Sequence, residues 1–365
     1  MCNNAGNGYR RKKRRQAFLV IAIACISFFF LPFHLAGQST APKEQVRFRV
    51  MEWNLENLFN ARHDTLKDDR EFLPDAIRHW NYTKYKKKLA DIACGITAVG
   101  EWEAPALVGL CEVESDTILR DLVHFSPLRE LGYRYVITDS PDLRGIDVAL
   151  LYQRDLFKLL EQRSISIPPL GKHRPTRDLL HVSGLLLTGD TLDVLVCHMP
   201  SRSGGVKVSE PYRLHAARQI RLQADSILNA RLHPQLIIMG DFNDYPTDKV
   251  FTEILQAFPP TDALAPRRLY HLLARKARDK NFGSYKYQGE WGLLDHLLVS
   301  GALLDNSSDF YTHEDKANVA RLPFLLKKDE KYGGDEPFRT YKGMKYQGGI
   351  SDHLPIYTDF ILRYE

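Results

Sequence analysis

The hydrophobic positions along the chain follow two spacings, which predict strands interleaved with helices. Residues 46–53 alternate apolar and polar side chains, the period of a half-buried strand. Residues 82–99 and 212–228 instead repeat apolar side chains every three or four positions, as one face of a helix does. The tripeptide Thr-Gly-Asp at 188–190 separates two apolar runs and predicts a hairpin turn. The other predicted strands are short apolar runs at 106–111, 133–138, 147–152, 179–187, 191–198, 235–239, 293–300 and 354–360.

This order of elements predicts a single α/β domain over residues 46–365, preceded by a linker at 38–45. The composition agrees, because 44% of the 365 residues are apolar and 26% are charged, enough apolar material for a sizeable core. One segment breaks the pattern. Residues 301–347 are rich in charge, Gly and Pro with little apolar content, and are predicted to form a long surface loop.

Residues 1–37 have the organisation of a targeting segment. Residues 10–15 are all basic, a largely apolar run follows at 17–35, and small residues occur at 36–39. This order is typical of a secretory signal peptide, and the run is also long enough for an N-terminal membrane anchor. Either way we expect an exported protein: periplasmic, secreted, or anchored so that it faces outside the cytoplasm.

The charge balance changes when this segment is set aside. The chain as a whole has a net charge of +5, but residues 38–365 hold 44 basic and 45 acidic residues, a net charge of −1. An overall basic surface for nucleic acid is therefore not indicated, and binding of a polyanion would need a local patch. Cys94, Cys111 and Cys197 lack the spacing of zinc ligands, which argues against structural zinc.

Several predicted strands end in side chains that can bind a metal or move a proton. Singly, an Asp or Asn after a strand is usually a turn or cap residue, and a lone His is usually structural. Their joint occurrence at the ends of six apolar runs predicts instead that they meet in one site. These residues are Asn54, Glu112, His198, Asp241, Asn243, Asp295, Asp352 and His353.

The order of the motifs resembles the endonuclease/exonuclease/phosphatase superfamily, over residues 46–362. The resemblance implies a four-layer α/β sandwich, in which two mostly antiparallel β-sheets pack face to face with helices on the outside. Residues 198–205, His-Met-Pro-Ser-Arg-Ser-Gly-Gly, are similar to a branch common among exported bacterial proteins. The matching motifs are Trp-Asn-Leu-Glu-Asn (53–57), Glu112, Arg-Gly-Ile-Asp-Val-Ala-Leu-Leu-Tyr (144–152), His198, Gly-Asp-Phe-Asn (240–243), Leu-Asp-His (294–296) and Ser-Asp-His-Leu-Pro (351–355).

The resemblance implies a catalytic role for five of these side chains. His198 and Asn243 match groups that contact the scissile phosphate, and Asp241 matches the residue that orients or deprotonates the attacking water. Asp295 matches a carboxylate near the leaving group or a second metal. His353 matches a histidine that works with a carboxylate, which can stabilise developing charge in a fixed tautomer.

Metal and substrate ligands follow from the same resemblance. Asn54, Glu112 and Asp352 match metal-binding groups, and their oxygen donors suit Mg²⁺, with Mn²⁺ or Ca²⁺ as alternatives. Three further residues are weaker candidates for substrate binding. These are Arg177, Tyr152 and Arg202.

The sequence therefore predicts a metal-dependent phosphoesterase. Its first expected activity is that of an endonuclease or exonuclease, a phosphodiesterase that hydrolyses nucleic acid by metal-assisted attack of water. Two alternatives stay open because the superfamily shares its chemistry across substrates: a phosphomonoesterase or a lipid or inositol phosphate phosphoesterase, and a non-catalytic binding module on the same fold. No structural protein partner is predicted.

Overall fold

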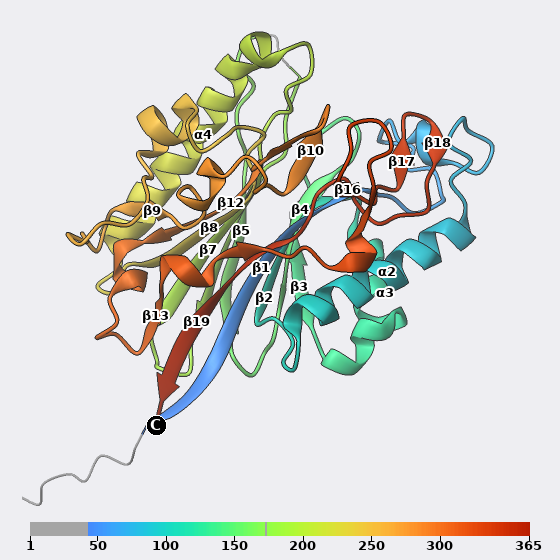
Figure 1. The fold of residues 1–365 in the computed structure, drawn as a ribbon. Helices are drawn as coiled ribbons and strands as arrows, with labels where there is room; N and C mark the ends of the chain where they lie inside the picture. Colours follow the sequence, from blue (N-terminus) through green and yellow to red (C-terminus); the bar gives the residue numbers. More distant parts are fainter. Residues whose placement is uncertain (1–42, 172–173) are drawn as a thin grey trace, which may run out of the picture. The chain divides into compact units, whose positions relative to one another are not determined.

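Two β-sheets packed face to face form the centre of the fold in the computed structural model, which describes residues 43–171 and 174–365 (Figure 1). The first sheet runs in the order β13 (Phe310–Thr312), β19 (Ile356–Tyr364), β1 (Glu44–Leu58), β2 (Leu107–Val113), β4 (Asp147–Tyr152) and β3 (Arg134–Ile137), with β14 (Asn318–Val319) also paired to β19. The second runs in the order β5 (Lys158–Ile165), β6 (Leu179–Leu185), β7 (Thr191–His198), β8 (Gln235–Asp241), β12 (Asp295–Ser300) and β9 (Leu269–His271).

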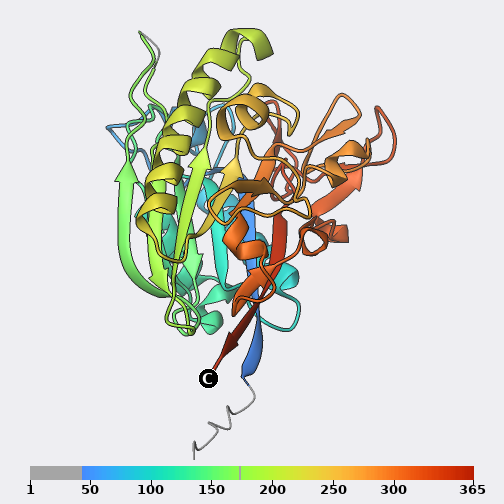
Figure 2. The same ribbon diagram turned by 90° about the vertical axis from the view of Figure 1, so that its left-hand side faces the viewer.

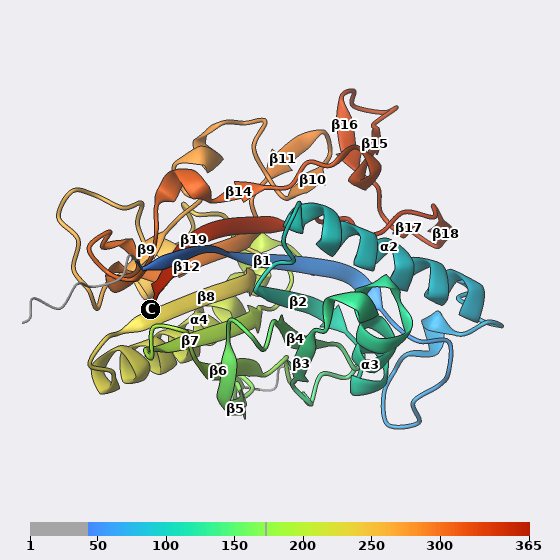
Figure 3. The same ribbon diagram turned by 90° about the horizontal axis from the view of Figure 1, so that it is seen from below.

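Helices cover the outer faces of the two sheets. Contacts with β1 and β3 place α2 (Tyr82–Gly100) and α3 (Asp116–Phe125) against the first sheet, and α4 (Val206–Ala230) crosses the second (Figures 2 and 3). The main apolar core lies between the sheets, and a second apolar cluster fills the space between α4 and the second sheet. The predicted four-layer sandwich is confirmed.

The strand pairing brings functional side chains to one edge of each sheet. Most pairs are antiparallel, but β1 pairs with β2 and β7 pairs with β8 in parallel. Parallel strands end at the same edge. Asn54 therefore pairs with Cys111 beside Glu112, and His198 pairs with Asp241. The antiparallel strand β12 then begins next to the end of β8, where Asp295 pairs with Asp241.

The prediction that residues 301–347 form a surface loop is wrong in part. The segment contributes β13 and β14 to the first sheet and folds into two hairpins. These are β15 (Leu326–Lys328) with β16 (Asp335–Pro337), and β17 (Tyr341–Lys342) with β18 (Lys345–Tyr346). A buried ion pair of 2.9 Å between Lys286 and Asp329 ties the first hairpin to β10 (Tyr285–Tyr287), which pairs with β11 (Glu290–Gly292). Strands of two or three residues are too short to show a hydrophobic period.

The beginning of the chain is only partly within the described residues. β1 begins at Glu44, inside the predicted linker, whereas the predicted signal or anchor at 1–37 lies outside them. None of the helices in the described part of the chain combines the length and apolarity needed to cross a membrane.

Gly240 is the tightest point of the second sheet. Its φ is +147°, and a Cβ atom there would lie 1.8 Å from the carbonyl oxygen of Cys197 on the adjacent strand. Only glycine can occupy this position while β7 and β8 stay paired. The close approach of Gly240 to Cys197 fixes the register of β7 and β8. It therefore sets the relative positions of His198 and Asp241, the next residues on the two strands.

We expect Gly240→Ala to lower the free energy of unfolding by about 3 kcal/mol or more, because the added methyl group forces the two central strands apart. Denaturant unfolding measures this. The matched control is Gly132→Ala, where φ is +66° but nothing lies within 4 Å of the added atom, and where we expect a loss of only about 1 kcal/mol. Equal losses in both variants would contradict the proposed close approach.

Candidate active site

Asp241 is at the centre of the polar groups that meet at the ends of the strands. Asn54 donates from Nδ2 to Oδ2 of Asp241 at 3.0 Å, and the backbone nitrogen of Asn243 donates to Oδ1 at 2.8 Å. Two imidazoles approach the same Oδ2: His198 Nε2 is 3.6 Å away and His353 Nε2 is 4.0 Å away. Burial raises the pKa of Asp241, although the charge of His353 opposes the rise. A buried carboxyl group with a raised pKa is a suitable proton acceptor.

Asp295 and His353 form a directly hydrogen-bonded pair. Nδ1 of His353 donates to Oδ2 of Asp295 at 2.7 Å, and the hydroxyl of Ser284 donates to the same oxygen. Burial by itself lowers the pKa of His353, but the charge and hydrogen bond of Asp295 outweigh it, so the pKa is well above its ordinary value. The imidazole is therefore held as a cation, with its Nε2 directed toward Asp241.

His198 is a buried imidazole of the opposite electrostatic character. Burial, followed by the positive charges of Arg177, Arg144 and His353, places its pKa well below the ordinary value. Its Nδ1 has no hydrogen-bond partner within the part of the chain described. Nε2 is 3.8 Å from Oε1 of Glu112, too far for a hydrogen bond. A neutral ring with an unpaired buried nitrogen is suited to contact a substrate oxygen.

Two partly exposed carboxylates form the rim of the site. The backbone nitrogen of Asn57 donates to Oε2 of Glu112 at 2.7 Å, which leaves Oε1 without a close partner. Asp352 lies 3.4 Å from a guanidinium nitrogen of Arg339. Glu112 has a φ of +65° and Asn57 a φ of +55°, unusual conformations for residues other than glycine, and such strain often accompanies function.

Two buried ionisable residues, Glu56 and Lys88, lie beneath the rim. Buried Glu56 lies beneath it, and its pKa is raised by burial and then by the charge of Asp352. The ammonium group of buried Lys88 donates to the Glu56 carbonyl oxygen at 2.6 Å, and burial lowers the pKa of Lys88. The carboxylate oxygens of Glu112 and Asp352 are hard donors of the kind that Mg²⁺ prefers. Asn54 fits less fully, because its Oδ1 already accepts a hydrogen bond of 2.9 Å from the Glu56 nitrogen.

Asn243 and Arg177 both contact the residue that follows His198. Both donate to the carbonyl oxygen of Met199, at 3.1 Å and 2.7 Å. Arg177 is buried, and a second donor lies 3.4 Å from Oδ2 of Asp142. Burial lowers the pKa of Arg177, and the charge of Asp142 partly offsets the effect.

The other two substrate candidates are placed differently. Arg202 donates to the Asn243 carbonyl oxygen at 2.7 Å and to Asp248 at 2.8 Å, so it fixes the loop after β8. Tyr152 pairs with Leu107, at the end of β4 opposite to Asp147 and the site. The structure therefore does not bring Tyr152 to the cleft residues, and Arg202 acts on them through the backbone.

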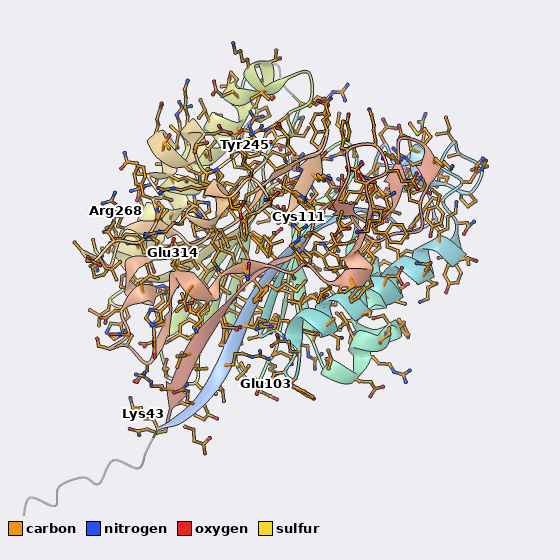
Figure 4. All side chains as sticks on the ribbon, in the orientation of Figure 1. Lys43, Glu103, Cys111, Tyr245, Arg268 and Glu314 are labelled. Carbon is orange, nitrogen blue, oxygen red and sulfur yellow. The ribbon has the colours of Figure 1, made fainter. Side chains whose placement is uncertain are left out.

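Sequence reasoning missed two buried groups beneath the site. Glu52 precedes Asn54 by two residues on β1, so it faces the same side, and its pKa is raised well above the ordinary value by burial and then by Asp295 and Asp241. The alternation of side chains between the two faces of β1 was the sequence signal that could have identified Glu52. Next to it lies Cys111, which is labelled near the centre of the molecule in Figure 4. It donates to the Cys197 carbonyl oxygen at 3.5 Å and so joins the two sheets.

The second missed group is a chain of two histidines. Leu273 donates to Nδ1 of His271, which leaves the proton on Nε2 to donate to Nδ1 of His296 at 2.8 Å. Nε2 of His296 then donates to the Asp244 carbonyl oxygen at 2.9 Å. Arg213, itself fully buried, pairs with the Asp244 carboxylate at 2.8 Å. These bonds fix the loop that carries Asn243, and no sequence signal links residues so distant along the chain.

Comparisons with known proteins identify the family. The profile described as the Endonuclease/Exonuclease/phosphatase family matches residues 49–361, and this chain belongs to that family. No curated protein matches the chain.

Solved structures show the same fold at low sequence identity. A family protein from Bacteroides thetaiotaomicron has a TM-score of 0.54 at 15% identity, covering 88% of this chain and 96% of its own. The mannosyl-6-phosphatase of the same organism has a TM-score of 0.53 at 16% identity, covering 86% and 99%. D. rerio TDP2 in complex with a single-strand DNA product has a TM-score of 0.51 at 16% identity, covering 86% and 98%.

The hydrogen bond between Asp295 and His353 leads to a prediction about the pH at which His353 titrates. In the chelated protein the imidazole of His353 should titrate above 6.5, the ordinary value, and Asp295→Asn should lower the midpoint, because burial then acts against only the charges of Asp241 and Asp352. Because the folded pKa is raised, the stability from this pair is present below the unfolded pKa and lost as pH rises through the folded one. Histidine NMR titration measures the midpoints. An unchanged midpoint in Asp295→Asn would show that Asp295 does not hold the charge.

Proposed function

We propose that this protein is a divalent-metal-dependent phosphodiesterase that hydrolyses nucleic acid by direct attack of water. Members of its family include nucleases and phosphatases that act on phosphoester bonds. The observation that carries the proposal is the approach of two unlike imidazoles, cationic His353 and neutral His198, to one oxygen of Asp241.

Each residue of the site has its own role in the proposed reaction. Oδ2 of Asp241 accepts a proton from the attacking water, whose oxygen bonds to phosphorus as the bond to the leaving oxygen breaks. The leaving oxygen keeps the bonding electron pair and takes a proton from solvent. His353, held cationic by Asp295, stabilises the charge that develops on the phosphoryl oxygens. His198 and Asn243 contact and orient the phosphate. A divalent ion bound by Glu112 and Asp352, beside Asn54, would supply Lewis-acid stabilisation of the same charge.

Nucleic acid is the first substrate class because a structure of the same fold was solved with it. The D. rerio TDP2 structure contains a single-strand DNA product. A phosphomonoester is the second candidate, supported by the fold shared with a mannosyl-6-phosphatase. The discriminating experiment assays the purified protein with Mg²⁺ or Mn²⁺ on plasmid DNA, RNA, a phosphomonoester sugar, inositol phosphates and sphingomyelin. Turnover of the sugar phosphate with no cleavage of nucleic acid would replace the first candidate with the second.

Metal dependence is expected to be absolute. Excess chelator should abolish hydrolysis, and added Mg²⁺ should restore it, because the partly exposed carboxylates of Glu112 and Asp352 supply the oxygen donors that this ion prefers. Glu112→Gln removes the charge but keeps the shape, so it should raise the Mg²⁺ concentration needed for half-maximal rate. Full activity in excess chelator contradicts the role of the rim.

Both site histidines are expected to be essential for turnover. His198→Ala and His353→Ala should each lower turnover by at least ~10²-fold, the usual effect of removing a positioned acid, base or charge-stabilising group. The control is His124→Ala on α3, an exposed histidine. Initial rates and thermal unfolding are measured together for all three. Near-normal turnover in either site variant would refute its assignment.

We further propose that the chain is exported, on the strength of the basic and apolar order of residues 1–37. Mass spectrometry of the native protein should find either a start near Gln38 or a full-length chain retained in a membrane. A full-length form in the soluble cytoplasmic fraction contradicts export.

A further inference from the structure

Arg144 occupies a rigid turn beside the candidate active site, between β3 and β4. Its backbone nitrogen donates to Oδ1 of Asp142 at 3.0 Å, and the nitrogen of Gly145 donates to the Asp142 carbonyl oxygen at 3.1 Å. Lys67 crosses the turn from outside and donates to the Ser140 carbonyl oxygen at 2.7 Å. The side chain of Arg144 is exposed, so its guanidinium projects from a fixed backbone.

Asp142 connects this turn to a second arginine. Its Oδ1 holds the backbone of Arg144, while its Oδ2 lies 3.4 Å from a guanidinium nitrogen of Arg177. Asp142 and Arg177 are both buried. One carboxylate therefore positions two arginines, one buried and one exposed, and balances the charge of only one of them.

The charge of Arg144, which Asp142 does not balance, lies near the catalytic groups. In the described chain no carboxylate lies within 4.0 Å of the Arg144 guanidinium. One guanidinium nitrogen is instead 3.5 Å from Oδ1 of Asn57, the residue whose backbone holds Glu112. The charges of Arg144 and Arg177 both act on His198, where they lower the pKa after burial does.

Arg177 and His198, which interact electrostatically, each carry an unpaired polar atom. Nε of Arg177 and Nδ1 of His198 are buried and have no hydrogen-bond partner among the described residues. Buried polar atoms are rarely left unpaired, and an exception often indicates a ligand or ion that would complete the pairing. The combination of an unbalanced cation and these two atoms calls for an anion with several oxygens.

We propose that Arg144 is a phosphate-binding residue, which together with Arg177 and His198 receives the non-bridging oxygens of the substrate's phosphoryl group. The planar fork of a guanidinium matches two oxygens of a phosphate, and charge-assisted hydrogen bonds of this kind are about twice as strong as neutral ones. The inference rests on the proposed function for its substrate. The phosphoryl group can come from a diester or from a terminal monoester, which share these oxygens.

The test measures binding of inorganic phosphate to the purified protein by calorimetry, with and without Mg²⁺. Arg144→Ala should weaken phosphate binding roughly 10-fold, the loss expected for a hydrogen bond to a charged group. Mg²⁺ affinity should not change. The matched control is Arg154→Ala, an exposed arginine just beyond the far end of β4, which should bind phosphate as the unaltered protein does.

Steady-state kinetics separate the two sources of the phosphoryl group. With bis(p-nitrophenyl) phosphate and p-nitrophenyl phosphate as substrates, Arg144→Ala should raise KM roughly 10-fold and change kcat less. Equal effects on the two esters assign Arg144 to oxygens that both share. A larger effect on the monoester assigns it to a terminal phosphate with two negative charges.

Failure of this inference is distinct from failure of the proposed function. Unchanged phosphate affinity and unchanged KM in Arg144→Ala overturn the inference even if the protein is an active phosphoesterase. Weakened Mg²⁺ binding with unchanged phosphate binding also overturns it, because Arg144 would then act only through Asn57 and Glu112. If the protein binds phosphate through Arg144 but hydrolyses no ester, the anion site stands and the proposed function falls.

Discussion

The hydrogen bond between Asp295 and His353 is the interaction on which the rest of the site depends. It joins the first residue of β12, in the second sheet, to the segment that leads into β19 in the first sheet. Without the carboxylate, burial would lower the pKa of His353 against only the charges of Asp241 and Asp352, and the field around Asp241 would change with it. The same bond places a cationic donor on one side of Asp241 while neutral His198 occupies the other. The different roles of His353 and His198 in the proposed reaction follow from this difference in charge.

Much of the fold follows from local signals in the sequence. The helix predicted at 82–99 is α2, and the strands predicted at 147–152 and 191–198 match β4 and β7 residue for residue, because long periodic or fully apolar runs have few alternative structures. β5 was missed because most of its side chains are exposed at the edge of the sheet, so no apolar alternation marks it. α4 begins at Val206, six residues before the predicted start, in a stretch interrupted by Pro211.

The candidate site was predictable where a polar residue ends an apolar strand, because strand ends in these sheets converge. His198, Asp241 and Asp295 are paired in adjacent strands, as expected. Roles that depend on the direction in which a side chain points were not predictable from the sequence. Arg202 has the chemistry of a phosphate ligand, but its donors are engaged by Asp248 and by the loop after β8. Glu52, Arg213 and the pair His271 and His296 act through contacts between distant segments, which no single stretch of sequence encodes.

The central claim is that metal binding and proton transfer occupy different groups: oxygens at the rim for the metal, and the buried set of Asp241, Asp295 and His353 for the proton and the developing charge. Those three buried side chains are themselves close enough together to hold an ion, so the claim can fail. The most direct measurement is the anomalous scattering of Mn²⁺ in crystals of the protein. The account predicts a peak bound by Glu112 and Asp352, with the bond between Asp295 and His353 intact. A sole peak between Asp241, Asp295 and His353 would contradict it.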